Sequence, residues 1–309
     1  MRPMDCAQRE GGSTLDHVQT KREIEELLGC AGLRPRKRFG QHFLVDGNLM
    51  RRLAESAELN PDDVVLEVGA GTGGLTDLLA NRAGRVICVE IDTDLFSILS
   101  ERFGRCANVE LICGDVLEQK HRLLSAVGNA LRGHNARGGV KLVSNLPYDI
   151  ATPLLMNLLV DYPQMSRFCF TVQAEVGDRI TAQSGTKAYG PLSILAQTIC
   201  TAQTVARIGP QSFWPRPLVD SVMLRLDRRE PAVLDGDELT RFSSLVHGVF
   251  EHRRKTLRSA LGYVIDETVR ERVCAAIDGS VRPEQITVAQ WLEILEILRR
   301  AERNLKSQI

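Results

Sequence analysis

The chain has 309 residues, more than one compact core usually holds, so we expect two domains. Its 39 Lys and Arg residues balance 39 Asp and Glu residues, which excludes attraction of a polyanion by net charge and leaves only local basic patches for a nucleic-acid site. No apolar run reaches membrane-spanning length and the polar N-terminus lacks the apolar segment of a signal peptide, so the sequence predicts a cytoplasmic protein without membrane contact.

Residues 1–32 are predicted to form a flexible N-terminal extension. Residues 1 to about 20 contain few large apolar side chains and include Gly11, Gly12 and Ser13, which is typical of a mobile tail. A short helix is predicted over residues 22–32.

A basic run follows, in which Arg34, Arg36, Lys37 and Arg38 are four of five consecutive residues. It leads into an apolar-polar hexapeptide, residues 39–44, and then into a helix predicted over residues 46–59. Such a run is usually a solvated segment. Its position equally indicates a loop that folds over a ligand cleft and turns its charges toward an anionic substrate.

The stretch from residue 64 to residue 80 predicts a strand, a tight glycine turn and a helix. The turn contains Gly69, Gly71, Gly73 and Gly74. Glycines allow positive φ angles and a close approach of the backbone to a ligand, and the N–H groups of the following helix are free to bind it. We therefore expect a cofactor at this turn.

Acidic residues at successive strand ends indicate which cofactor this is. Gly69, Gly71 and Gly74 match the dinucleotide fingerprint, and Glu90 closes the next strand about 20 residues later, where an acid binds ribose hydroxyls. Both NAD and S-adenosylmethionine contain this ribose. Glu67 before the glycines and Asp115 after a third strand, where it would accept a bond from an adenine amino group, favour a nucleoside cofactor over acids that merely end strands.

Strands and helices alternate after the glycine turn, which predicts a Rossmann-like α/β fold with a doubly wound, mostly parallel sheet. The predicted strands cover residues 86–90, 109–113 and 141–145, with a helix over residues 94–103. The segment 118–139 interrupts this rhythm with a helix predicted over 121–133 and a loop after it.

The eight cysteines contain no C-x-x-C pair, and Cys88, Cys113 and Cys169 lie within apolar, strand-like runs. This pattern predicts reduced core residues rather than disulfides or zinc ligands.

The tetrapeptide Asn145, Leu146, Pro147 and Tyr148 ends the strand over 141–145, at the edge where such sheets bind ligands. The amine of a nucleobase is a poor nucleophile until it is held, because its lone pair is delocalised. The amide oxygen of Asn145 and the backbone carbonyl of Leu146 would accept its two N–H bonds, while Pro147 fixes the backbone and Tyr148 stacks on the base. The alternative is a simple turn.

From about residue 229 the pattern becomes helical without a glycine turn, which predicts a smaller C-terminal helical domain over 229–309 after a first domain over 33–228. Apolar residues recur at helical spacing and leave a basic cluster at the end of the helix, for which a solvated face is the default interpretation. The apolar set is Phe242, Val246, Val249, Phe250, Leu257 and Leu261; the basic cluster is Arg253, Arg254, Lys255 and Arg258.

An ordered set of motifs resembles the ribosomal RNA adenine N6,N6-dimethyltransferase family, and within it the bacterial KsgA-type small-subunit enzymes. The resemblance extends from about Arg34 to Leu298. The motifs are RFGQHFL, EVGAGTGGLT, VEID, GDVL, NLPY, QAEVGDRI, YGPLSIL, FWPRPLVDS, FEHRRKTLRSAL and RPEQITVAQWLEIL.

The resemblance implies the roles of individual residues. It places S-adenosylmethionine (SAM) near Gln41, His42, Leu44, Gly69, Gly71, Glu90, Asp115, Val116 and Asn145, and it implies that Phe213 sandwiches the target adenine opposite Tyr148, whereas the residues alone predict a core aromatic. Beside the cleft of such an enzyme the two basic runs would grip phosphates. The chain departs from the family at Asp149, usually Asn, and Ala174, usually Lys, and the segment 118–139 is longer than usual.

The sequence thus predicts a SAM-dependent enzyme that dimethylates two adjacent adenosines in a hairpin loop near the 3′ end of 16S ribosomal RNA, within the assembling 30S subunit. It is expected to be a monomer and to require no metal. An NAD-dependent oxidoreductase would need an acid-base residue, and no His stands at a strand end. A ribosome-assembly or transcription factor that keeps the fold only for binding would not need the intact residues 145–148.

Overall fold

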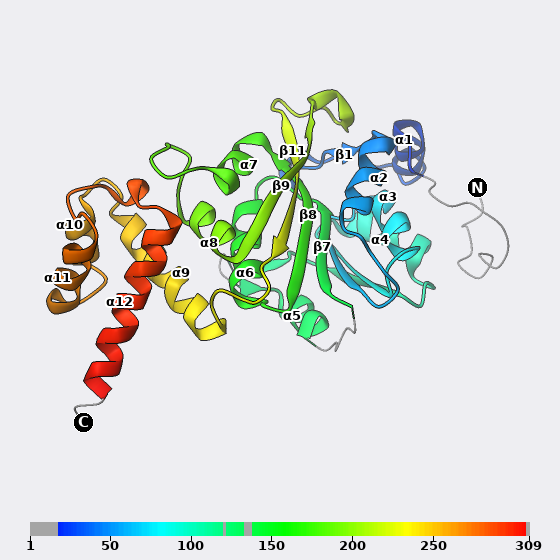
Figure 1. Cartoon of the computed structure of the whole chain (residues 1–309). Coiled ribbons are helices and arrows are strands. Elements are labelled where there is room, and N and C mark those ends of the chain that lie inside the picture. Colours follow the sequence, from blue (N-terminus) through cyan, green and yellow to red (C-terminus); the bar gives the residue numbers. More distant parts are fainter. Residues whose placement is uncertain (1–17, 120–121, 133–137, 307–309) are drawn as a thin grey trace. The chain divides into compact units, whose positions relative to one another are not determined.

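The computed structural model describes residues 18–119, 122–132 and 138–306 (Figure 1). The chain divides into two compact units. The first contains residues up to 158, 162–177 and 203–228, and the second contains 159–161, 178–202 and 229 onward. Residues 178–202, which the sequence analysis assigned to the first domain, thus group with the C-terminal helices. The predicted mobile tail, residues 1–17, lies outside the described residues.

The first unit is built on a seven-stranded sheet with the strand order β4-β3-β2-β7-β8-β11-β9. The ladders from β4 through β8 are parallel, and β11 pairs antiparallel with β8, which confirms the predicted mostly parallel sheet. The strands are β2 Val64–Val68, β3 Arg85–Glu90, β4 Val109–Cys113, β7 Val140–Asn145, β8 Met165–Gln173, β9 Cys200–Ile208 and β11 Ser221–Arg228.

The strand order reverses between β2 and β7. From β2 the chain proceeds outward through β3 to β4, then crosses back to β7 on the other side of β2. At such a reversal the connections leave in opposite directions and open a crevice at the carboxyl ends of the strands. The glycine turn after β2 and the tetrapeptide after β7 therefore flank the same crevice.

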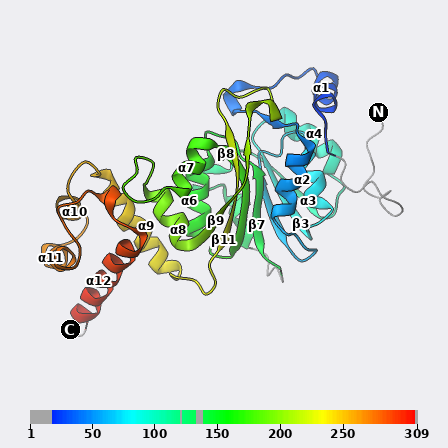
Figure 2. The ribbon, with the colours of Figure 1, turned by 45° about the horizontal axis from the view of Figure 1, so that its top comes forward.

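Helices cover the sheet on both faces (Figure 2). On one face, apolar residues of α2, α3 and α4 form a core with Val65, Val86 and Cys88 of the sheet. The alternate residues Leu66 and Ile87 are fully buried as well, because strands with covered faces bury both sets of side chains. The helices are α1 Lys21–Cys30, α2 Gly47–Ser56, α3 Gly74–Ala80, α4 Thr93–Phe103, α5 Ser125–Arg132, α6 Ala151–Asp161 and α7 Ala174–Thr181.

Short elements fix the ends of this unit. The helix α1 starts at the capping box of Thr20 and Glu23 and buries Ile24 and Leu28 against α4, so this part of the predicted flexible extension is packed. Strand β1 Phe43–Leu44 pairs with β10 Phe213–Trp214. The 3₁₀ helices are η2 Lys37–Phe39, η3 Pro210–Ser212 and η4 Pro283–Gln285, of which η4 lies in the second unit.

The segment 118–139 differs from the prediction. A small hairpin of β5 Leu117–Gln119 and β6 Arg122–Leu123 occupies its start, and α5 begins only at Ser125. Strands of two or three residues are too short to show a periodic pattern, which is why the sequence indicated a longer helix instead. Part of the predicted loop, residues 133–137, lies outside the described residues.

The cysteines follow the prediction in part. Cys88 and Cys169 are buried, free thiols. Cys113 is exposed, because it ends the edge strand β4, which no further strand covers. Cys106 is disulfide-bonded, which corrects the expectation of reduced cysteines at that residue.

The second unit is helical, as predicted. The predicted apolar set on α9 and α10 is buried, and the fully buried Trp291 packs its ring 6.0 Å from that of Phe250. None of the helices in the described residues has both the length and the apolar character needed to cross a bilayer. The helices are α8 Pro191–Ile199, α9 Gly236–Glu251, α10 Leu257–Leu261, α11 Glu267–Ala276 and α12 Val288–Lys306.

Candidate active site

A cavity of about 350 Å³ opens at the carboxyl ends of β2 and β7. This volume lies within the range of small-molecule and cofactor sites. Its lining includes every residue that the resemblance assigned to SAM and all four residues of the tetrapeptide: Gln41, His42, Leu44, Gly69, Gly71, Glu90, Asp115, Val116, Asn145, Leu146, Pro147 and Tyr148.

The glycine turn brings backbone to the cavity wall. Gly69 and Gly71 have φ angles of 75° and 62°, which side chains other than hydrogen rarely permit. A Cβ at Gly69 would lie 2.9 Å from Pro147 Cγ, and one at Gly71 would lie 3.0 Å from Phe43 Cε1. The turn is therefore a cradle that only glycine leaves open, which fits the adenosyl and amino-acid parts of SAM.

Glu90 stands at the cavity wall and is held by backbone donors. Gly71 N donates to its Oε2 at 2.8 Å, and Asp92 N donates to its Oε1 at 2.9 Å. Burial raises the pKa of this carboxyl, and the two backbone hydrogen bonds oppose that shift. Each oxygen retains a lone pair, so Glu90 can accept the ribose hydroxyls while it fixes the glycine turn.

Glu67 lies deeper, beneath the turn, and is fully buried. Its Oε2 accepts a hydrogen bond of 2.7 Å from the Thr76 hydroxyl, and the Cys88 thiol lies 3.5 Å away. Burial raises the pKa of Glu67 to about 8. At neutral pH this side chain is therefore largely an uncharged carboxylic acid.

We expect Glu67→Gln to stabilise the protein increasingly as the pH rises. The pKa of Glu67 rises from 4.5 to about 8 on folding, so the folded wild type binds a proton that the unfolded chain releases, and its unfolding free energy falls across this range. Glutamine remains neutral and escapes this loss. The difference in unfolding free energy between variant and wild type should grow from pH 5 to pH 8 in denaturant titrations. A constant difference would show that Glu67 titrates normally.

Asn145 is oriented from both ends of its amide. Its Nδ2 donates to the His42 carbonyl at 2.9 Å, and its Oδ1 accepts a hydrogen bond from the Thr171 hydroxyl. Only the nitrogen can donate to a carbonyl, so this contact fixes which end is the oxygen. One lone pair of Oδ1 remains available to a substrate amine.

Tyr148 lies against His42, with ring centroids 5.4 Å apart in a stacked arrangement. Its hydroxyl lies 2.8 Å from the Ser221 hydroxyl, and burial raises its pKa, so it is a neutral phenol. The His42 ring is fixed in turn, since its Nδ1 lies 2.6 Å from the Pro215 carbonyl oxygen. One face of the Tyr148 ring is thus supported by protein.

The description "Ribosomal RNA adenine dimethylase" belongs to the family model that matches residues 32–300. The chain belongs to this family. It is 38% identical over 288 residues to Ribosomal RNA small subunit methyltransferase A of Moorella thermoacetica, covering 92% of this chain and 100% of the relative. It is 42% identical to the protein of the same name in Geobacter metallireducens, covering 74% of this chain and 81% of the relative.

Solved structures agree with this assignment. The 23S rRNA methyltransferase ErmE is 27% identical, with a TM-score of 0.60 over 83% of this chain and 99% of that chain. A dimethyladenosine transferase from Plasmodium falciparum is 23% identical, with a TM-score of 0.64 over 84% of this chain and 98% of that chain, and supports the fold. The predicted resemblance, the Rossmann-like methyltransferase fold and the enzyme class, an rRNA adenine dimethyltransferase, are confirmed.

Phe213 lies elsewhere than its predicted role requires. It is 3% exposed, pairs with Leu44 between β1 and β10, and belongs to the hydrophobic core rather than to the cavity lining. The two-residue ladder turns its ring inward, as the pattern of the residues alone predicted. In this arrangement the adenine sandwich that the resemblance implied has its Tyr148 side only.

Three positioning residues of this family member were missed by the sequence analysis. Thr171 and Ser221 are buried on β8 and β11 and hold Asn145 and Tyr148. Gln19, just before α1, lines the cavity; its Oε1 accepts a hydrogen bond of 2.7 Å from the Thr72 hydroxyl in the glycine turn. No local pattern marks these residues, because each acts across a long sequence separation.

The basic residues predicted to bind RNA differ in their surroundings. Arg36 forms ion pairs with Asp92, at 2.8 Å, and with Asp94, so it is not a free cation. Arg38 is exposed, lines the cavity and lies 4.6 Å from the centre of the Phe39 ring. The side chain of Lys37 is outside the described part of the structure.

In the second unit, Arg253, Arg254 and Lys255 form an exposed turn between α9 and α10. Arg258 is exposed too but pairs with Glu271 at 2.5 Å. No group of three or more His, Cys, Asp and Glu side chains in the described residues is arranged to hold a metal ion.

Proposed function

We propose that this enzyme transfers methyl groups from SAM to the N6 amino groups of two adjacent adenosines, in a hairpin loop near the 3′ end of 16S rRNA, as a cytoplasmic monomer acting on the assembling 30S subunit. The observation that carries the proposal is the position of Asn145, whose oriented amide oxygen faces the same cavity as the glycine cradle. The similarity to small-subunit enzymes supports the choice of rRNA.

Bound SAM supplies an electrophilic methyl group on its sulfonium. The chain supplies position: Asn145 Oδ1 and the Leu146 carbonyl accept the two N–H bonds of the adenine amine, which turns its lone pair toward the methyl group. The supported ring of Tyr148 stacks on the base, worth about 1–3 kcal/mol. Glu90 and Asp115 bind the ribose and adenine of the cofactor, and Gln41, His42, Leu44 and Val116 complete its walls.

The substrate test uses small subunits that lack the modification. The purified protein should transfer tritium from methyl-labelled SAM to these subunits and not to large subunits. Label on large subunits instead would move the enzyme to the other branch of its family. Absence of transfer to either, with intact SAM binding, would favour a protein that keeps the fold for binding only.

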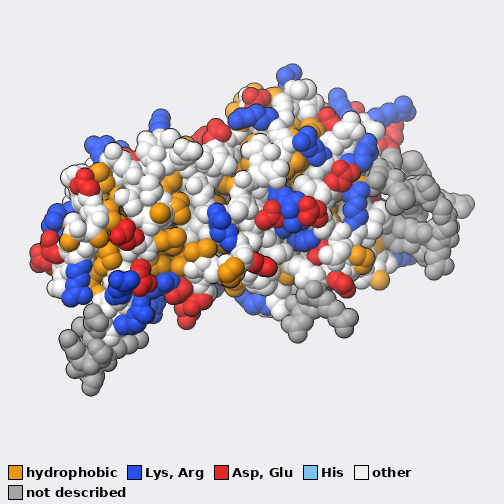
Figure 3. All heavy atoms as spheres, in the orientation of Figure 1, with side chains coloured by type: hydrophobic (Ala, Val, Ile, Leu, Met, Phe, Trp, Pro, Cys, Tyr) orange, Lys and Arg blue, Asp and Glu red, His pale blue; other side chains and the backbone are white. Residues whose placement is uncertain are grey.

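RNA binding is assigned to local patches because the net charge is zero. On the face drawn in Figure 3, acidic and basic side chains intermingle rather than segregate. We assign phosphate contacts to Arg253, Arg254 and Lys255 on the second unit and to Arg38 beside the cavity. Arg36 and Arg258 are already paired with carboxylates and are weaker candidates.

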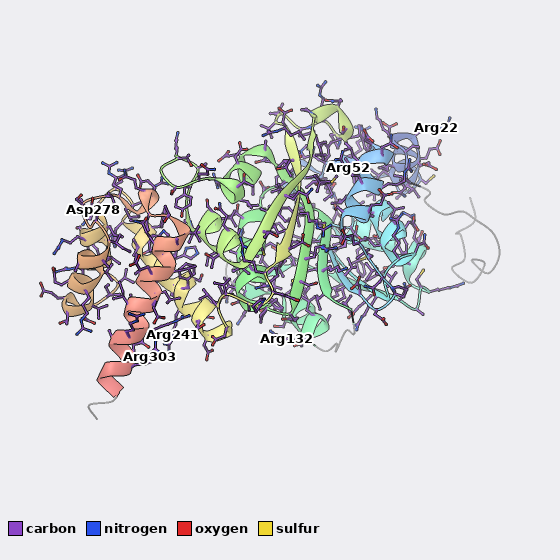
Figure 4. All side chains as sticks on the ribbon, viewed as in Figure 1. Arg22, Arg52, Arg132, Arg241, Asp278 and Arg303 are labelled. Carbon is purple, nitrogen blue, oxygen red and sulfur yellow. The ribbon has the colours of Figure 1, made fainter. Side chains whose placement is uncertain are left out.

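Replacing Arg253, Arg254 and Lys255 with Gln should weaken subunit binding mainly at low salt and leave SAM affinity unchanged. Each lost phosphate contact should flatten the dependence of log affinity on log salt by about 0.7–0.9 units. The matched control is Arg241→Gln with Arg303→Gln, at the end of this unit that lies away from Asp278 (Figure 4). A normal slope and a normal melting temperature in the triple variant would leave this turn a solvated face.

A further inference from the structure

Tyr263 is the largest exposed apolar side chain beside the basic turn of the second unit. It follows α10 and is 58% exposed. Its ring stacks on that of His252, the residue that ends α9, with centroids 3.8 Å apart and planes 26° apart. An aromatic ring of this size is rarely left in water without a purpose when a neighbouring ring already fixes its orientation.

The contacts of Tyr263 leave one ring face open. His252 covers one face. The Lys255 ammonium donates a hydrogen bond to the Tyr263 hydroxyl and therefore lies toward that edge, 4.4 Å from the ring centroid. No other described ring or cation is recorded in contact with Tyr263. The open face is thus flat, pre-oriented and next to a cation.

The charges around this ring select its occupant. Arg253 and Arg254 are exposed and form no ion pair with any described residue, so the turn offers two uncompensated guanidinium groups within a few residues of the ring. A flat aromatic face next to free cations matches an unpaired nucleotide, whose base stacks while its phosphates take the charges. A carboxylate-rich protein segment would use the charges but not the ring face.

We propose that Tyr263 is a stacking platform for an unpaired nucleobase of the RNA substrate, distinct from the adenine-binding cavity, and that the flanking phosphates lie on Arg253, Arg254 and Lys255. This inference rests on the proposed function, because it assumes a ribosomal RNA substrate. It predicts that the second unit contributes sequence-tolerant stacking as well as charge, so the two contributions are separable by salt.

Tyr263→Ala should weaken binding to small subunits by roughly 5- to 150-fold, the equivalent of one lost base stack. The slope of log affinity against log salt should stay unchanged, since no charge is removed, in contrast to the triple Gln variant. Tyr263→Phe keeps the ring and should bind nearly as well as the wild type, while Tyr263→Leu should resemble Tyr263→Ala. The turnover number at saturating subunits should be unchanged in all three, with only KM raised.

Tyr263→Trp gives a second readout that does not depend on the stability of the alanine variant. Its added indole fluorescence should be quenched by an unpaired oligonucleotide and not by a duplex, relative to the wild-type background from Trp214 and Trp291. Unchanged affinity in Tyr263→Ala and Tyr263→Leu, with normal methyl transfer by the wild type, would overturn the platform alone. A loss seen with intact subunits but not with protein-free rRNA would assign Tyr263 to a ribosomal protein and also overturn it. Absence of methyl transfer by the wild type would instead contradict the proposed function.

Discussion

Asn145→Ala is expected to slow methyl transfer at least ~10²-fold while it retains most of the affinity for SAM. The reason is that the amide oxygen mainly orients the adenine amine, and without it the lone pair is no longer aimed at the methyl group. Some weakening of SAM binding is expected as well, because Asn145 lines the cofactor cavity. The ratio of the two effects, from single-turnover rates and calorimetric titration, is the measurement.

Two further variants sharpen this test. Thr171→Val removes the hydroxyl that donates to Asn145 Oδ1 and should lower the rate less than Asn145→Ala, because the bond from Nδ2 to His42 remains. Asn157→Ala is the matched control, since its Nδ2 also donates to a backbone carbonyl, that of Pro153, but it does not line the cavity. It should lower stability without a change in rate. Equal losses of SAM affinity and turnover in Asn145→Ala would make Asn145 chiefly a cofactor ligand.

Glu90→Ala should weaken SAM binding by about 1.5–3 kcal/mol, the range for hydrogen bonds to a charged group, and leave RNA binding nearly intact. The structure adds a second contribution, because the same carboxylate accepts hydrogen bonds from Gly71 N and Asp92 N. Removing it leaves two donors unpaired and loosens the glycine turn. Isothermal titration with SAM measures the loss.

Glu90→Gln separates these contributions. It keeps an oxygen for one backbone donor but loses an acceptor for the ribose, so its SAM affinity should fall between that of the wild type and that of Glu90→Ala. NADH should bind none of the three proteins. Unchanged SAM affinity in Glu90→Ala would reduce Glu90 to a structural acid at a strand end.

The parts of the site that the sequence predicted share one property: their signals are local. The glycine turn follows directly from a buried strand and leads into a helix, and Asn145 closes the next inner strand of the sheet. Once the sheet is parallel, strand ends of this kind meet at one edge, and the reversal of strand order between β2 and β7 brings them to one cavity.

The parts that the sequence missed depend on tertiary contacts. Thr171 holds Asn145 from the neighbouring strand β8, and Gln19 holds the glycine turn from the start of α1. Neither contact has a periodic signature, since each joins residues that only the fold makes neighbours. Phe213 shows the same limit from the other side, because a two-residue ladder with β1 decides which way its ring points.

The most direct test of the account is to locate the methyl groups on the product. Undermethylated small subunits are incubated with the enzyme and SAM, and the rRNA is digested to nucleosides and to fragments for mass spectrometry. The account predicts N6,N6-dimethyladenosine at two adjacent positions in one hairpin loop near the 3′ end, and none with Asn145→Ala at matched times. Methyl groups on another base, at a single position only or at an atom other than N6 would contradict it.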